Sequence, residues 1–227
     1  SQCTAVGHQA LTANQTGSFI TAIGNNALTA CTASENTAVG WDAGGSIVGG
    51  ASNVMIGSNA GDTLTSGNSN TCLGDSSDVS ATGSTNQTAI GFATIAQADN
   101  SVTLGNASVT AVYMAQDKGA KVLAGGIAFT GSELTVSSGA VTATGSYHRI
   151  DTEGDAGTDS LVTINGGVDG QLLILQSAGS ARDTTLEDTG DAGGNLFLSA
   201  DFTLNHAQDS ITLLYSATDS GWIEVSR

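Results

Sequence analysis

The amino-acid sequence predicts an all-β protein in which a solenoid of stacked coils is followed by a β-sandwich or jelly-roll-like domain. The first observation is a repeated motif in which a branched aliphatic residue precedes a glycine. These glycines recur every 16 or 17 residues, with a last step of 14, at Gly7, Gly24, Gly40, Gly57, Gly74, Gly91 and Gly105. A fixed period with a fixed apolar column is typical of a quasi-one-dimensional stack of repeats.

The second observation is the composition of the 227 residues. There are 31 glycines and no proline, and only 11% of residues are charged, so the usual helix-forming Glu, Lys and Arg are scarce. Short runs of Val, Ile and Thr favour strands instead. Disorder is disfavoured because 39% of the residues are hydrophobic and they fall in register.

The repeat predicts the structure of residues 1–111. Each coil of about 17 residues has room for two short strands and two turns, stacked at a spacing of roughly 4.8 Å. We expect the aliphatic residues before the glycines to form a thin continuous core, with smaller residues beside them allowing close packing. Glycine at the strand end permits a positive φ or a close approach to the next coil. The recurring Asn residues, such as Asn36 and Asn53, are expected to hydrogen-bond the turn backbone.

A core one aliphatic residue wide is thin for a free-standing monomer. Self-association would supply the missing burial, and a homotrimer is the expected form.

Residues 112–145 lose the 17-residue rhythm and are predicted to form a β-rich connector or neck. Strands are expected at residues 112–115 and 121–123. A hairpin turn at residues 137–139 would join two further strands.

Residues 146–227 are predicted to form the C-terminal domain. Short apolar runs recur roughly every ten residues, at 161–164, 172–175, 196–198, 202–204, 211–215 and 222–225. The turns between them are rich in Gly and Asp, a pattern that favours a β-sandwich or jelly roll. Trp222 is expected in its core.

The formal net charge of −16 argues against a nucleic-acid partner and favours solubility. Three cysteines at no metal-like spacing, Cys3, Cys31 and Cys72, predict no disulfide framework, and Cys72 is expected to be buried. We expect no membrane insertion, because no apolar run reaches the length of a span. A start at Ser1 rather than Met is compatible with a fragment.

The segment Asn36-Thr37-Ala38-Val39-Gly40-Trp41-Asp42-Ala43-Gly44 resembles the Asn-Thr-Ala-Val-Gly-aromatic-x-Ala-Gly repeats of bacteriophage tail fibres. The repeat also resembles the head repeats of trimeric autotransporter adhesins, although its period is slightly longer. The resemblance covers about residues 1–111 and implies a left-handed parallel β-roll in an intertwined homotrimer. Residues 145–155 and 221–227 are similar to a C-terminal module of tail-fibre proteins. The absence of a following membrane-anchoring barrel segment favours a phage origin over an adhesin.

Candidate sites are few. Trp41 and Phe92 follow a repeat glycine in an otherwise polar column, so we expect exposed aromatics that could bind a receptor or pack against a neighbour. For the acidic clusters Asp151/Glu153/Asp155/Asp159 and Asp183/Glu187/Asp188/Asp191, a solvated turn is favoured over a calcium site. For His8, His148 and His206 we expect exposure or hydrogen bonding and assign no metal.

The expected function is therefore that of a structural virion fibre protein, extracellular and without enzymatic activity or cofactors. Its expected partners are further copies of itself, other tail proteins, and a host surface glycan or outer-membrane protein. The alternatives are a head fragment of a bacterial trimeric autotransporter adhesin and a polysaccharide-degrading tail spike. Carboxylate pairs could serve the spike, but no spacing singles out two of them.

Overall fold

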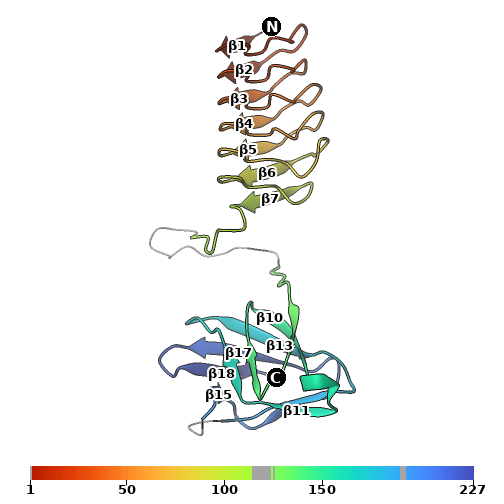
Figure 1. Cartoon of the computed structure of the whole chain (residues 1–227), viewed down its shortest axis with the longest axis vertical. Coiled ribbons are helices and arrows are strands. Elements are labelled where there is room, and N and C mark those ends of the chain that lie inside the picture. Colours follow the sequence, from red (N-terminus) through yellow and green to blue (C-terminus); the bar gives the residue numbers. More distant parts are fainter. Residues whose placement is uncertain (1, 114–123, 125, 190–192) are drawn as a thin grey trace. The chain divides into compact units, whose positions relative to one another are not determined.

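The computed structural model describes residues 2–113, 124, 126–189 and 193–227. The described chain is all-β: it contains no α-helix, and one short 3-10 turn covers Glu153–Asp155. The chain divides into two compact units, Ser1–Lys121 and Val122–Arg227, which are considered separately (Figure 1).

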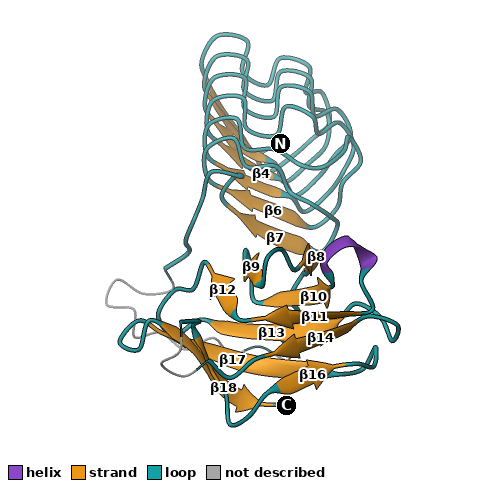
Figure 2. Ribbon diagram, turned by 60° about the horizontal axis from the view of Figure 1, so that its bottom comes forward, coloured by secondary structure: helices purple, strands orange, loops and turns teal. Residues whose placement is uncertain are grey.

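The first unit contains one seven-stranded parallel sheet whose strands follow the chain order. Each coil adds one strand, and the coils lie one above another (Figure 2). The strands are β1 (Cys3–Val6), β2 (Ile20–Ile23), β3 (Thr37–Val39), β4 (Val54–Ile56), β5 (Thr71–Leu73), β6 (Gln87–Ile90) and β7 (Ser101–Leu104). The register is strict, so equivalent motif residues are direct neighbours: Thr21 pairs with Thr37, and Thr37 pairs with Val54.

The described coils contain one strand each, whereas two had been predicted. On the return side the coils are joined by single backbone hydrogen bonds, such as Leu28 N–H to Ala43 O at 3.0 Å and Gly44 N–H to Ala60 O at 2.8 Å. Residues with left-handed backbone, including Leu28 (φ 49°) and Gly44 (φ 58°), interrupt the extended conformation there. The return side is therefore hydrogen-bonded between coils without forming a regular strand.

The repeat glycines are fixed by both conformation and space. Gly57 has φ +136°, and a Cβ atom added to it would lie 2.2 Å from the carbonyl oxygen of Gly74 in the next coil. The other glycines of the column have φ between +83° and +142°. A side chain is excluded at this point because the backbones of adjacent coils meet there.

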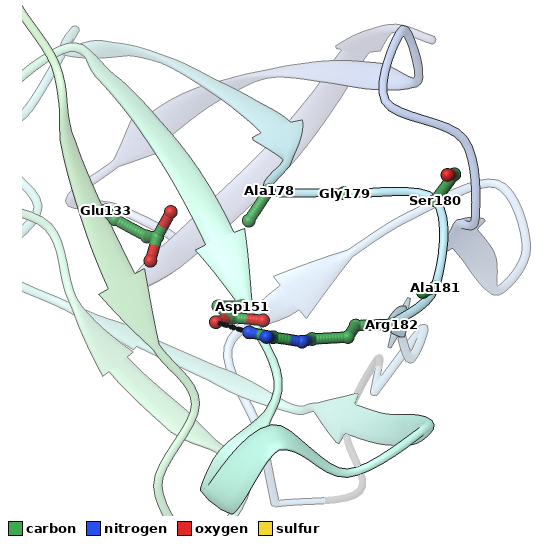
Figure 3. Close-up of a pocket in the computed structure, with 7 residues that line it drawn as sticks. All are labelled: Glu133, Asp151, Ala178, Gly179, Ser180, Ala181 and Arg182. Carbon is green, nitrogen blue, oxygen red and sulfur yellow. Dashed lines mark hydrogen bonds and ion pairs between the residues drawn. The ribbon is translucent and has the colours of Figure 1, made fainter.

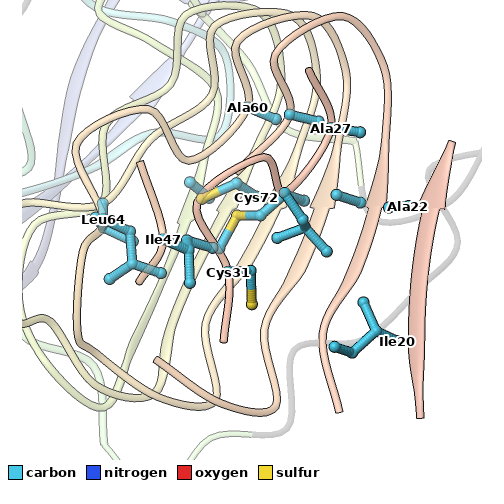
Figure 4. Close-up of a cluster of buried hydrophobic side chains, with 14 of the residues drawn as sticks. Ile20, Ala22, Ala27, Cys31, Ile47, Ala60, Leu64 and Cys72 are labelled. Atoms are coloured by element: carbon cyan, nitrogen blue, oxygen red, sulfur yellow. The ribbon is translucent and has the colours of Figure 1, made fainter. Parts of the chain in front are cut away.

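The core of the first unit is formed by the small residues of the motif, not by the aliphatic ones. Ala22, Ala38, Met55, Cys72 and Ala89 are fully buried. Larger side chains complete the core: Ile20 at the start of β2, and Ile47 and Leu64 from the turns (Figure 4). Leu28, also from a turn, belongs to the same core. The predicted aliphatic core column is wrong, because side chains alternate along a strand and the residue next to the buried one faces outward.

The second unit contains three sheets. A six-stranded sheet has the order β15-β18-β17-β13-β10-β8, a three-stranded sheet β11-β14-β16, and a two-stranded sheet β12-β9. The strands are β8 (Ser132–Thr135), β9 (Ala140–Thr142), β10 (Tyr147–Asp151), β11 (Thr158–Leu161), β12 (Thr163–Asn165), β13 (Leu172–Ser177), β14 (Asp183–Leu186), β15 (Leu196–Phe197), β16 (Phe202–Leu204), β17 (Ser210–Ser216) and β18 (Gly221–Ser226).

All three sheets contribute to one core, which includes Ile150, Leu161, Ile164, Leu204 and Trp222. Trp222 is fully buried, as expected, and its indole N–H donates to the carbonyl oxygen of Ile164 at 2.9 Å. The second unit therefore has a core of large side chains that all come from the same chain.

The predicted turn at residues 137–139 is present: Ser137 and Ala140 exchange backbone hydrogen bonds of 2.9 and 3.1 Å around Ser138 and Gly139, which both have positive φ. The predicted pairing of the two flanking strands as a hairpin is wrong. β8 pairs with β10 and β9 pairs with β12, so the two strands lie in different sheets, apart from a single bridge between Ser137 and Ala140. Val136 and Val141 are buried in the core of the second unit, which explains why this stretch belongs there and not to a connector. Val112 and Tyr113 lie outside any strand, and the rest of the predicted strands at 112–115 and 121–123 falls outside the described residues.

Candidate functional site

The most extensive surface feature of the first unit is a stack of branched aliphatic side chains on the outer face of its sheet. We call it the outer aliphatic column; it consists of Val6, Ile23, Val39, Ile56, Leu73, Ile90 and Leu104. Six of the seven side chains are exposed, from 37% for Ile56 and Ile90 to 57% for Val6, and Val39 is half-buried. The sheet thus presents one aliphatic side chain per coil to solvent.

A second column runs parallel to the first on the same face, two residues earlier in each strand. It is made of Thr4, Thr21, Thr37, Val54, Thr71, Thr88 and Val102. Neither column contains a charged residue, although the whole chain carries a formal charge of −16. An uncharged face that carries a continuous aliphatic stripe is typical of a surface that is covered by protein.

The two aromatics singled out from the sequence are both exposed, Trp41 by 53% and Phe92 by 68%. The structure does not bring them together. Stacked glycines place Gly40 next to Gly57, then Gly74 and Gly91, so the two side chains are separated by three coil spacings, or about 14 Å. A third aromatic, Phe19, is 61% exposed and lies just before β2. Phe19 precedes the repeated motif, so the columns of the repeat do not predict its exposure.

Asparagine side chains form a buried ladder beside the strands. The Asn36 side-chain oxygen accepts from the backbone N–H and the side-chain amide of Asn53, at 2.9 and 3.1 Å. Asn53 repeats both contacts with Asn70, and the Asn70 oxygen accepts from the Gln87 backbone at 3.0 Å. All four side chains are buried, so this column is structural and carries no free binding group.

The three histidines differ in their surroundings. His8 is exposed, and His206 is exposed beside Asn205 and Asp209. His148 is buried: its Nε2 accepts from the backbone N–H groups of Thr144 and Gly145, at 3.2 and 3.1 Å. Its Nδ1 therefore carries the proton and faces Ser132 of β8. His148 joins β10 to β8 and is not available to a ligand.

A polar cavity of about 400 Å³ lies in the second unit (Figure 3). It is lined by Glu133 of β8, Asp151 at the end of β10, and the loop of residues 178–182 that connects β13 to β14. Asp151 was predicted to lie in a solvated turn, but its side chain is only 9% exposed and forms an ion pair with Arg182. Because Arg182 is 31 residues away, no local sequence signal could have shown the pair.

The remaining acidic candidates are less enclosed. Glu153 and Asp155 are exposed, Asp159 accepts from the Glu153 backbone N–H at 2.8 Å, and Asp191 lies outside the described residues. The described residues contain no group of three or more His, Cys, Asp or Glu side chains suited to a metal ion. Within the same part of the chain, no helix has the length and apolar character needed to span a membrane.

The cysteines are free thiols. Burial raises the pKa of Cys72 to about 12, with a smaller contribution from the negative charge of Asp78, and burial also raises the pKa of Cys31. Both thiols are therefore protonated at neutral pH and act as small apolar side chains.

Comparison with known proteins returned no matching family model, no similar curated protein and no similar solved structure. The fold and the surfaces define a stacked-coil β protein with a second β unit. Its function has to be inferred from the outer aliphatic column, the exposed aromatics and the polar cavity.

Proposed function

We propose that the protein is a structural, non-enzymatic fibre protein of a phage virion that mediates attachment to the host cell surface. In this proposal the first unit is a left-handed β-roll that associates with two further copies into an intertwined homotrimer, and the second unit is a β-sandwich-type domain. The fibre would be extracellular, joined to other tail proteins. Its receptor would be a surface glycan or an outer-membrane protein, contacted by Trp41, Phe92 or the loops.

The observation that carries the proposal is the outer aliphatic column. Completing the burial of each of its side chains would contribute on the order of 1 kcal/mol, since about half of each remains exposed in a single chain. The strict register repeats this gain in every coil. A stack of coils whose aliphatic face is covered by its own copies matches the structural role of a fibre segment.

This face can accommodate further copies of the same chain in spite of their acidity. The two columns carry no charge, so copies that each bear a formal charge of −16 can meet there without placing like charges in contact. The acidic residues elsewhere would keep assembled fibres apart in solution.

Light scattering tests the assembly. We expect a particle of three times the 22.4-kDa chain mass. Leu73→Asp should dissociate it, because the new carboxylate would be buried among aliphatic side chains. Thr82→Asp is the matched control, since it adds the same charge to an exposed position of the same coil. A monomeric wild type, or an unchanged mass for Leu73→Asp, would contradict the proposed homotrimer.

Cryo-electron microscopy of the native particle tests the location, and inhibition of phage adsorption by the purified protein tests attachment. A gene neighbourhood without tail proteins, together with a longer frame that ends in a membrane barrel, would favour the adhesin alternative. Release of reducing ends from host polysaccharide would show an enzyme instead.

A further inference from the structure

The polar cavity of the second unit is held in shape by its own hydrogen bonds. Asp151, at its floor, accepts from the Thr152 backbone N–H at 2.9 Å and pairs with Arg182, which also contacts Asp155 at 2.8 Å. The guanidinium of Arg149 donates to the carbonyl oxygen of Ala178 at the start of the loop. The loop of residues 178–182 is therefore tied to the β10 region at both ends.

Further contacts fix the first part of this loop. The Ala178 backbone N–H donates to the Ile150 carbonyl oxygen at 2.9 Å, and the Ser177 hydroxyl donates to the Gly179 carbonyl oxygen at 2.5 Å. A ligand entering the cavity would meet walls that are already ordered, so little conformational entropy would be lost on binding.

Two lining groups retain free hydrogen-bonding capacity. Among the described residues, the carboxylate of Glu133 and the hydroxyl of Ser180 have no side-chain partner, and Figure 3 shows the Glu133 carboxylate on one wall and the Asp151–Arg182 pair on the floor. A carboxylate only accepts hydrogen bonds, a guanidinium only donates, and a hydroxyl does both. A ligand that satisfies all of them needs neighbouring groups that both donate and accept.

The charges of the cavity are nearly balanced. Glu133 and Asp151 are acidic, Arg182 is basic, and Arg149 is the direct cross-strand neighbour of Glu133. This balance disfavours a strongly charged ligand of either sign. The methyl groups of Ala178 and Ala181 add a small apolar wall suited to C–H groups. The volume lies within the range of about 300–1,000 Å³ that small-molecule sites occupy.

We propose that this cavity binds one neutral saccharide unit, whose vicinal hydroxyls donate to Glu133 and accept from Arg182 and Ser180. The proposal rests on the proposed attachment function, since it names the class of receptor group that one site would recognise. It assigns that recognition to the second unit, whereas Trp41 and Phe92 belong to the first.

The test is saturation-transfer difference NMR on the full chain with the methyl glycosides of glucose, galactose and mannose as probes. We expect at least one to bind with a dissociation constant on the order of 1 mM. Glucuronic acid and glucosamine serve as charged analogues, and both should bind more weakly than the best neutral glycoside. Tighter binding of either charged sugar would overturn the assignment of a neutral ligand.

Two variants locate the site. Glu133→Ala removes the acceptor from an exposed position, and Ala181→Trp fills the cavity. Glu133→Ala should weaken binding about tenfold or more, the effect expected for losing a hydrogen bond to a charged group. Ala181→Trp should weaken binding at least as much, because its indole ring takes up the space of the ligand. Glu187→Ala is the control, because it removes the same charge from a residue that does not line the cavity. Absence of binding by all three glycosides, or unchanged binding by both variants, would overturn the proposal.

The result of the glycoside-binding test can be distinguished from the results that test the proposed fibre function. A trimer on the virion that binds none of the glycosides would refute only the saccharide site. A monomer that binds a glycoside at this cavity would refute the fibre assembly and leave the site standing.

Discussion

The two units of the chain differ in which strand side chains they bury. In the first unit most of the fully buried motif residues are small, such as Ala38 and Ala89, while the branched aliphatics beside them are exposed. In the second unit the buried residues are large, and Trp222 and Leu213 lie inside with three sheets around them. The first unit therefore leaves a column of branched aliphatic side chains exposed on its sheet, whereas the second unit buries most of its large apolar side chains between its sheets.

The difference shows how stability is distributed. The first unit is held by backbone hydrogen bonds between coils and by the Asn36–Asn53–Asn70 ladder, all of which repeat with the sequence. Its side-chain core is thin, so it depends on the close approach of adjacent backbones. The second unit depends on a few large side chains, and we expect each unit to fail for a different reason.

The largest expected loss of stability comes from adding a side chain where the backbones of two adjacent coils meet. Gly57→Ala would place a Cβ atom 2.2 Å from the Gly74 carbonyl oxygen at φ +136°, so the coils have to separate. We expect a loss of at least about 5 kcal/mol in the first unit, in the range of severe substitutions. Hydrogen-exchange mass spectrometry should show lost protection in β4 and β5 and unchanged protection in β13 and β17.

Gly83→Ala provides the matched control for that substitution. A Cβ atom there would meet only the Ser66 hydroxyl, at 3.7 Å. Its stability should stay within about 0.5 kcal/mol of the wild type. Equal effects of the two alanines would show that backbone contact between coils does not determine the stability of the first unit.

The next largest expected loss of stability is that of Trp222→Ala, and it should far exceed that of Trp41→Ala. Trp222→Ala leaves a cavity in the second unit and removes the hydrogen bond to the Ile164 carbonyl oxygen, so we expect a loss of about 3–5 kcal/mol. Trp41→Ala removes an exposed ring and should change stability by less than about 0.5 kcal/mol. Urea unfolding followed by hydrogen exchange measures both, and a comparable loss for Trp41→Ala would show that this ring is covered.

The sequence predicted the features that depend on repetition. A glycine that recurs at a fixed interval identifies a backbone contact, and the all-β class follows from the composition. The period alone could not decide which side of the strand faces inward. In Thr37–Val39 the inner residue is Ala38 and the outer one is Val39, and both are apolar, so hydrophobicity favoured the wrong face.

Contacts between residues that are far apart in the sequence could not be predicted in this way. The Asp151–Arg182 ion pair, with the cavity above it, forms only when the β13–β14 loop returns to the end of β10. β8 looked like half of a hairpin because its true partner, β10, follows only after the intervening strand β9. Such contacts are set by the sheet order, which short-range patterns in the chain do not contain.

The smallest expected effect is a loss of stability at alkaline pH, and it concerns only the unit that contains the cysteines. All three thiols lie in the first unit, and burial raises the pKa of Cys72 from 9.0 to about 12. Since the folded state holds this proton more tightly, its contribution to stability is complete below pH 9 and is lost as the pH rises from 9 towards 12. Cys72→Ala, which introduces the residue that the next coil has at this position (Ala89), should remove this part of the pH dependence. Between pH 9 and pH 10 the wild type should lose up to about 1 kcal/mol more than the variant. Cys31, whose pKa is also raised, is present in both proteins, so its contribution cancels. Urea unfolding at pH 9 and pH 10 measures the free energy that each protein loses. Equal losses for the wild type and Cys72→Ala would contradict burial of the Cys72 thiol.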